Sequence, residues 1–174
     1  KPQKIIVVYG FGGEKVCEPF AGEELIWVKQ AEQLGTGHAV QQALPHLDVD
    51  ANTLILLGDV PLVDAEACKA LIEKANNQLA ILSFIKSDPT GYGRLVRNNQ
   101  LVTAIVEHKD ATEAQREIQE VNTGIMAVPN RYLTSWLSQL TNDNVQGEYY
   151  LTDIVALAVQ QNVTVMAEVT TDEW

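Results

Sequence analysis

One carboxylate at the end of an apolar run is the residue best placed for chemistry in this sequence. Residues 53–57 read Thr-Leu-Ile-Leu-Leu, and Gly58, Asp59 and Pro61 follow. Four consecutive aliphatic residues predict a strand buried on both faces of a parallel sheet, and Pro61 stops that strand from continuing. Asp59 would then lie at the carboxyl end of a strand, where open α/β sheets bind ligands. A metal or ligand role for Asp59 and a local role in satisfying loop amides are equally compatible with this segment.

A second candidate lies between an apolar run and a predicted helix. Gln30 carries an amide with a donor and an acceptor, the pairing needed to read an imide edge such as that of uracil. Gly35 and Gly37 bracket Thr36, so this backbone is bare and a flat ring could pack against it. We expect Thr36 to cap a helix that extends to Leu44. The simpler alternative is a surface glutamine and a helix start softened by glycine.

Five further positions follow or interrupt strand-like segments. Gly93 lies in a turn-rich loop whose glycines let the backbone approach a ligand, and Glu107 follows an apolar strand, where it could accept hydrogen bonds from hydroxyls. Asn122 interrupts an apolar strand, so its amide needs a partner in the backbone or in a ligand. Tyr150 and Thr152 start a helix, which is unusual for residues that only pack. For Glu107, the simpler alternative is a solvated charge.

The elements that would position these residues alternate along the chain. Apolar runs predict strands at 5–8, 25–28, 53–57, 79–85, 94–97, 101–106, 121–128 and 163–169. Asp64, Thr112 and Asn130 are predicted to cap helices, and Asn99 lies in the turn of a predicted β-hairpin. We therefore expect an α/β fold with a mostly parallel mixed sheet, helices on its faces and a β-hairpin insertion.

Two of the predicted helices carry apolar faces. Cys68, Leu71, Ile72 and Ala75 follow the spacing i, i+3, i+4 and i+7, which predicts a face turned to the core. Trp136 belongs to a similar face, and we interpret it as a core residue rather than a platform on which a base would stack.

Composition narrows the classes of function. The chain has 174 residues, 46% of them hydrophobic, and a formal net charge of −11 with no cluster of basic residues. This size predicts a single domain, and this charge argues against a nucleic-acid surface. The two cysteines show no spacing typical of a zinc site or a disulfide framework. This cysteine usage fits a reducing, cytoplasmic setting, and no apolar segment approaches the length that spans a membrane, so we expect a soluble protein.

Several motifs together resemble one family of sugar nucleotidyltransferases. These motifs are Gln-Ala-Glu-Gln-Leu-Gly-Thr-Gly-His-Ala, Gly-Asp-Val-Pro, Pro-Thr-Gly-Tyr-Gly-Arg, Ile-Val-Glu-His-Lys-Asp, Asn-Thr-Gly-Ile and Gly-Glu-Tyr-Tyr-Leu-Thr-Asp. In this order they resemble the N-terminal domain of the bacterial bifunctional N-acetylglucosamine-1-phosphate uridyltransferase and glucosamine-1-phosphate acetyltransferase. Gly-Asp-Val-Pro alone is common to many nucleotidyltransferases, but the last motif and Glu-His-Lys-Asp are specific to this branch.

The resemblance implies a Rossmann-like nucleotidyltransferase fold and a reaction. That reaction transfers a uridylyl group from UTP to N-acetylglucosamine 1-phosphate and gives UDP-N-acetylglucosamine and pyrophosphate. UDP-N-acetylglucosamine feeds cell-wall and lipopolysaccharide synthesis. The resemblance also implies that Asp59 is catalytic and binds Mg²⁺. The nucleotide would contact Gln30, Gly35, Thr36, Leu57 and Gly58, and the sugar would contact Gly93, Glu107, Asn122, Tyr150 and Thr152.

The sequence departs from this family at both ends and at one internal position. Nothing in residues 1–28 matches the family's opening strand and its glycine-rich phosphate loop, and the family's C-terminal repeat domain has no counterpart here. Leu57 stands where relatives often carry a tyrosine. We therefore expect residues 1–174 to form a single, partial nucleotide-diphospho-sugar transferase domain that turns over poorly or not at all. The intact parent is expected to be a homotrimer and this piece a monomer.

Three alternatives remain at this level. The chain could be a nucleotidyltransferase for another base and sugar, such as guanosine and mannose. It could also bind nucleotide sugars without catalysis, in which case binding would not depend on a metal. A glycosyltransferase is the weakest alternative, because Gly-Asp-Val-Pro lacks the second aspartate of the Asp-x-Asp pair that such enzymes use.

Overall fold

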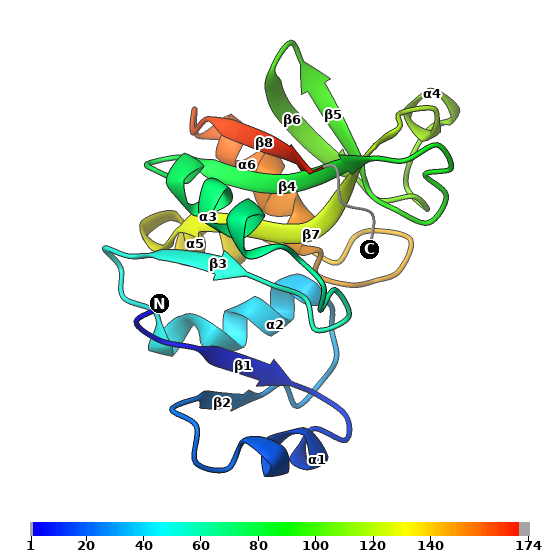
Figure 1. Cartoon of the computed structure of the whole chain (residues 1–174). Coiled ribbons are helices and arrows are strands. Elements are labelled where there is room, and N and C mark those ends of the chain that lie inside the picture. Colours follow the sequence, from blue (N-terminus) through cyan, green and yellow to red (C-terminus); the bar gives the residue numbers. More distant parts are fainter. Residues whose placement is uncertain (1, 171–174) are drawn as a thin grey trace.

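A computed structural model describes residues 2–170 of the chain, apart from the side chain of Glu14. Strands and helices alternate along it (Figure 1). The strands are β1 (Ile6–Tyr9), β2 (Ile26–Lys29), β3 (Asn52–Ile55), β4 (Leu79–Ile85), β5 (Arg94–Asn98), β6 (Leu101–Val106), β7 (Glu120–Pro129) and β8 (Val165–Thr170). The helices are α1 (Glu14–Cys17), α2 (Thr36–Ala43), α3 (Ala65–Lys74), α4 (Glu113–Arg116), α5 (Asn130–Leu137) and α6 (Ile154–Gln160), with 3₁₀ turns η1 (Glu18–Phe20), η2 (Leu44–His46) and η3 (Leu151–Asp153).

Strand β7 organises the larger sheet. It pairs antiparallel with β3, β4 and β5, and β8 joins β4 in parallel. The hairpin of β5 and β6 continues the sheet from the β5 edge, and its turn places Asn99 at a φ of 56°. Strands β1 and β2 form a separate, parallel two-stranded sheet. The α/β class, the mixed sheet and the hairpin insertion are therefore as expected. The prediction that the sheet is mostly parallel was wrong, because β7 is antiparallel to all three strands that pair with it and, among the described strands of this sheet, only β4 and β8 pair in parallel.

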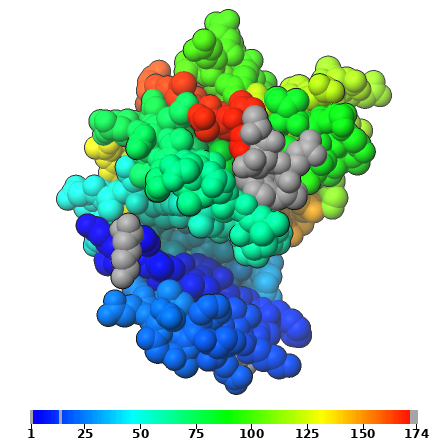
Figure 2. All heavy atoms as spheres, viewed as in Figure 1, coloured from blue at the N-terminus to red at the C-terminus, as the bar shows by residue number. Residues whose placement is uncertain are grey.

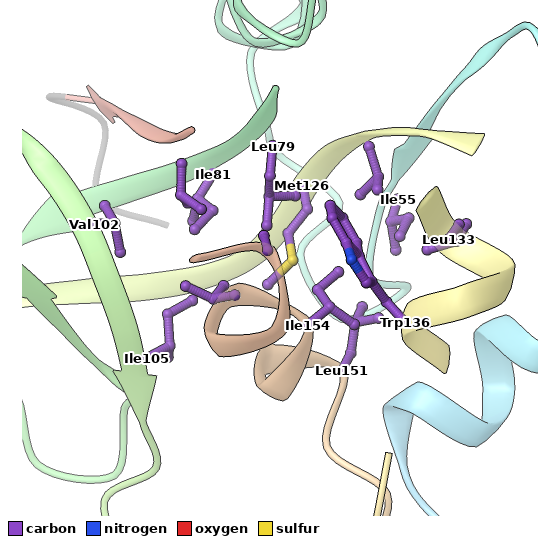
Figure 3. Close-up of a cluster of buried hydrophobic side chains, with 14 of the residues drawn as sticks. Ile55, Leu79, Ile81, Val102, Ile105, Met126, Leu133, Trp136, Leu151 and Ile154 are labelled. Atoms are coloured by element: carbon purple, nitrogen blue, oxygen red, sulfur yellow. The ribbon is translucent and has the colours of Figure 1, made fainter. Parts of the chain in front are cut away.

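Helices cover both faces of the larger sheet (Figure 1). On one face, α5 and α6 pack against alternate residues of β4 and β7, including Leu79, Ile81 and Met126. On the other face, Leu71 of α3 packs against the intervening residues, such as Leu82 and Ile125. Figure 3 shows the first cluster, in which Trp136 lies beside Met126 and Ile154. The interpretation of Trp136 as a core residue is confirmed, since its side chain is fully buried.

Two predictions about burial were wrong. The strand predicted at 53–57 ends at Ile55 and pairs only with β7 among the described strands, so Leu56 is 50% exposed. An edge strand has a neighbour on one side only, and aliphatic runs do not distinguish it from a central strand. In α3, Leu71 and Ala75 are fully buried, but Ile72 is 43% exposed because it lies at the border of the packed face.

Helix starts were predicted with mixed success. Asp64 caps α3 by accepting hydrogen bonds from two main-chain N–H groups, and Thr112 forms the predicted capping box at α4. Asn130 is not the cap of α5, since its side chain instead donates to the carbonyl of Asp48 and accepts from Thr53.

Within residues 2–170, every helix falls short of the length or apolarity required to span a bilayer. Figure 2 shows one face in space-filling form, hollowed between the blue N-terminal segment and the cyan segment that carries β3.

Candidate functional site

Glu107 lies at the centre of a group of predicted residues. It follows β6, and its Oε1 accepts a 2.9 Å hydrogen bond from Thr152 Oγ1 in η3. Gly93, just before β5, lies directly against the same carboxylate. A Cβ atom at Gly93 would lie 3.3 Å and 3.4 Å from the two carboxylate oxygens and 3.1 Å from Ile105. Only glycine leaves the space in front of this carboxylate open.

Asn122 on β7 borders the same space. Its main-chain N–H donates to the carbonyl of Gly93 at 2.9 Å, and its Oδ1 accepts from the N–H of Gly124 at 3.1 Å. Its Nδ2 donates to no residue in the described part of the chain. The amide is therefore oriented by Gly124, and its donor group is available for a ligand.

The carboxylates in this region are crowded and partly desolvated. Burial is the main cause that raises the pKa of Glu107; the hydrogen bond from Thr152 opposes this, and the charge of Asp110 adds to it. Burial also raises the pKa of Asp153, with smaller contributions from Glu107 and Asp110. The Tyr150 hydroxyl donates to Asp110 across a long 3.4 Å contact. Such a group of acceptors favours a ligand that brings hydroxyl donors and no negative charge.

Gln30 and the start of α2 form a second group. The Gln30 N–H continues the main-chain pairing after β2 by donating to Tyr9 O at 2.8 Å. The Gln30 side chain is 8% exposed, and its Nε2 donates to Gly35 O at 3.1 Å and lies 3.0 Å from His38 Nδ1. Its Oε1 accepts from no described residue. Since no buried side-chain nitrogen or oxygen in residues 2–170 lacks a partner, Oε1 must reach solvent.

Two predictions for this segment need correction. Thr36 is the first residue of α2 rather than its cap, and its Oγ1 accepts a 3.1 Å hydrogen bond from Leu151 N. The bare sides of Gly35 and Gly37 do not face open space, because added Cβ atoms would meet Tyr149 O at 2.7 Å and 2.9 Å. These glycines are required for close packing of α2 on the segment before α6, and Gly35 also needs its φ of 111°.

Asp59 stands apart from both groups. It lies in the exposed loop after β3, and its side chain makes no hydrogen bond or ion pair with a described residue. The loop is anchored by Leu57, whose side chain lies directly against Gly124, where a Cβ atom would come within 2.2 Å of it. Gly58 is exposed and borders open space. In residues 2–170, no three His, Cys, Asp or Glu side chains lie close enough to hold a metal together.

The structure therefore brings most predicted residues together through two connections. Residues 149–152 join the group around Gln30 to the group around Glu107, and the contact of Leu57 with Gly124 connects the Asp59 loop to β7. Sequence reasoning gave no role to His38, Gly124 or Asp153. The only signal for Gly124 was its place in the Asn-Thr-Gly insert of an apolar strand, and His38 had none because its partner Gln30 lies eight residues earlier. Two surface hollows, around Asp50 and Arg131 and around Arg94 and His108, contain none of the predicted residues.

The fold of this chain is shared with a solved structure of a protein described as a nucleotidyltransferase. A crystal structure of a protein described as a glucose-1-phosphate thymidylyltransferase from Bacillus anthracis superimposes with a TM-score of 0.76 at 17% identity, covering 98% of this chain and 69% of that one. This similarity establishes the fold alone. The chain belongs to the family of MobA-like NTP transferase domains, whose model matches residues 1–124.

Nearer relatives share half or more of the sequence. The bifunctional protein GlmU of Methylobacillus flagellatus is 59% identical over 173 residues, which are 99% of this chain and 38% of the relative. GlmU of Nitrosospira multiformis is 59% identical over 94% of this chain and 36% of its own length. GlmU of Acinetobacter baumannii is 55% identical over 94% of this chain and 36% of the relative. The chain thus spans a little over a third of the length of these relatives.

Proposed function

We propose that this chain binds uridine nucleotides and N-acetylglucosamine phosphates as a single domain of a uridylyltransferase. The reaction transfers a uridylyl group from UTP to N-acetylglucosamine 1-phosphate and releases pyrophosphate. One observation carries the proposal: a single short segment contacts both groups of predicted residues. Tyr149 O accepts from Gly37 N, Leu151 N donates to Thr36, and Thr152 donates to Glu107. A ligand with a nucleoside at one end and a sugar at the other matches two subsites held at a fixed separation.

The hydrogen-bonding groups of the nucleoside subsite are complementary to those of an imide. Gln30 Oε1 is an open acceptor, and the main-chain N–H of Gly35 donates to no described residue. Because Gln30 Nε2 donates to Gly35 O, the open acceptor on the Gln30 side chain and the open N–H of Gly35 belong to two residues that are in direct contact. Uracil offers an N–H beside a carbonyl, which complements this pair. GlmU relatives at 59% identity are consistent with this assignment.

The sugar subsite consists of an acceptor facing a donor. The Glu107 carboxylate would accept from hydroxyls of the sugar, and Asn122 Nδ2 would donate to a hydroxyl or to the acetamido oxygen. The open space at Gly93 lets the sugar approach the carboxylate. Thr152 and Tyr150 would act on the sugar chiefly by orienting Glu107 and Asp110, with which they form hydrogen bonds.

Asp59 fits a Mg²⁺ ion shared with substrate phosphates. Its carboxylate is exposed and uses none of its oxygens on described residues, and Mg²⁺ binds through one or two carboxylates plus phosphate oxygens and water. When bound, such an ion would neutralise charge on the phosphates. The residues of this chain would position the sugar phosphate in line with the α-phosphorus, since phosphoryl transfer depends mainly on positioning and charge stabilisation.

Calorimetric titration of the 174-residue chain with UDP-N-acetylglucosamine tests the proposal. Titrations with and without Mg²⁺, and with GDP-mannose as the matched control, separate base and sugar selectivity from general nucleotide binding. We expect saturable binding of UDP-N-acetylglucosamine that Mg²⁺ strengthens, and at least tenfold weaker binding of GDP-mannose. Equal affinity for the two ligands, or no binding by a sample with a cooperative thermal transition, would contradict the proposal.

A further inference from the structure

We infer that His38 is a positioning residue that fixes the polarity of Gln30 and so lets the nucleoside subsite distinguish uracil from cytosine. The inference rests on the proposed function, because it assumes that the base binds at Gln30. It concerns a residue that would not itself touch the base.

Both hydrogens of the Gln30 amide are used inside the protein. One is donated to Gly35 O at 3.1 Å, and the other points to His38 Nδ1 at 3.0 Å. A carbonyl oxygen can only accept, so the bond to Gly35 O identifies the amide nitrogen and leaves Nδ1 as the acceptor of the second hydrogen. Gln30 therefore offers a ligand its oxygen and nothing else.

Tyr149 and Gln42 pack against the His38 ring. It lies on the first turn of α2, and its centroid is 6.4 Å from that of Tyr149, in a tilted arrangement. The amide nitrogen of Gln42 donates to the main-chain carbonyl of His38 at 3.0 Å. Its 3.2 Å approach to His38 Nε2 is a packing contact and not a hydrogen bond, because Nε2 carries the ring proton when Nδ1 accepts. A ring packed in this way keeps Nδ1 directed at Gln30. The Gln30 amide, which is nine-tenths buried, cannot easily turn away from it.

A single open acceptor discriminates between the two pyrimidines. Uracil presents N3–H, which would donate to Gln30 Oε1, whereas cytosine has a lone pair at N3, which would face the same oxygen. If His38 did not accept, one Nε2 hydrogen would be unpaired. The amide would then be held only by its bond to Gly35 O, and a rotation that breaks this one bond would direct Nε2 at the base, where it would suit cytosine N3. His38 would thus contribute to selectivity through Gln30.

Three versions of the 174-residue chain test this inference: the wild type, His38→Phe and His38→Asn. Phenylalanine keeps a flat ring against Tyr149 without an acceptor, and asparagine keeps an acceptor near the place of Nδ1. The ratio of the Kd of CDP to the Kd of UDP, measured by calorimetry, is the readout. We expect His38→Phe to lower this ratio about tenfold, equivalent to about 1.4 kcal/mol. His38→Asn should restore most of the wild-type ratio. An unchanged ratio in a folded His38→Phe chain would overturn the inference.

A second measurement keeps the inference testable if the wild-type chain binds neither nucleotide, a result that would count against the proposed function only. NMR of the side-chain amides reports hydrogen exchange at Gln30 Nε2 without any ligand. Both hydrogens should exchange slowly in the wild type, and one should exchange faster in His38→Phe. The amide of the exposed Gln100, whose side chain makes no hydrogen bond with a described residue, serves as the control. Exchange at Gln30 as fast as at Gln100 in the wild type would refute the assignment.

Discussion

Thr152 Oγ1 donates a 2.9 Å hydrogen bond to Glu107 Oε1 and so joins η3, just before α6, to the loop that follows β6. Thr152 is buried, and among the described residues it alone donates a hydrogen bond to the Glu107 carboxylate. We expect Thr152→Val to lower the free energy of unfolding by about 1 to 3 kcal/mol, because it removes a donor to a charged group. It should also weaken binding of UDP-N-acetylglucosamine about tenfold. Thr152→Ser, which retains the hydroxyl, should behave like the wild type in urea denaturation and titration. Equal losses in the two variants would contradict this role.

The raised pKa of Glu107 predicts how stability depends on pH. Burial raises this pKa above its ordinary value of 4.5, so over the interval between the two values the folded chain holds more protons than the unfolded chain. The contribution of Glu107 to the free energy of unfolding therefore falls as the pH rises through that interval. Glu107→Gln removes this titration, so its stability relative to the wild type should increase between pH 4 and pH 7. Urea denaturation at several pH values measures the difference, and a constant difference would refute the prediction.

Asp59 should matter for the metal and not for the fold. Because its carboxylate is exposed and makes no bond to a described residue, Asp59→Asn should change the free energy of unfolding by less than about 0.5 kcal/mol. The same change should abolish the gain in affinity for UDP-N-acetylglucosamine that Mg²⁺ provides. Calorimetric titrations with and without Mg²⁺ check this. A gain that persists in the variant would favour a binding module that needs no metal.

Gly35 should be intolerant of a side chain, and Gly58 should accept one. A Cβ atom at Gly35 would lie 2.7 Å from Tyr149 O, and its φ of 111° is one that side chains rarely adopt. We expect Gly35→Ala to cost about 2 to 5 kcal/mol of the free energy of unfolding. Gly58 meets no atom within 4 Å, so Gly58→Ala should cost less than about 0.5 kcal/mol. Similar denaturation midpoints for the two variants would refute the packing of α2 described above.

Local patterns predicted elements well where the physical cause is itself local. The capping box of Thr112 with Gln115 and the turn at Asn99 depend on residues that are neighbours in sequence, and both are present. The exposure of Leu56 depends on whether a further strand lies beside β3, which no run of aliphatic residues can encode. The direction of β7 against its three partners is likewise a property of the whole sheet.

The candidate site was predictable in its residue types and less so in its bonds. Glu107, Gly93 and Asn122 were chosen because of their positions beside strands, and the structure brings them together. Thr36 was chosen as a cap, but its hydroxyl accepts from Leu151, a residue 115 positions away in the sequence. Spacing along the chain carries no information about such contacts. His38 was missed for a related reason, since its effect on Gln30 depends on the geometry of an amide.

The three pairings of β7 also impose an order of events on a nascent polypeptide. Strands β3, β4 and β5 all precede β7 and all pair with it, so none of them can complete its ladder before β7 is synthesised. Strand β3 needs residues up to Pro129, which pairs with Asn52. At synthesis rates of about 5 to 20 residues per second, β3 waits several seconds with both edges unpaired. During this interval the aliphatic run of β3 is exposed to association with other chains.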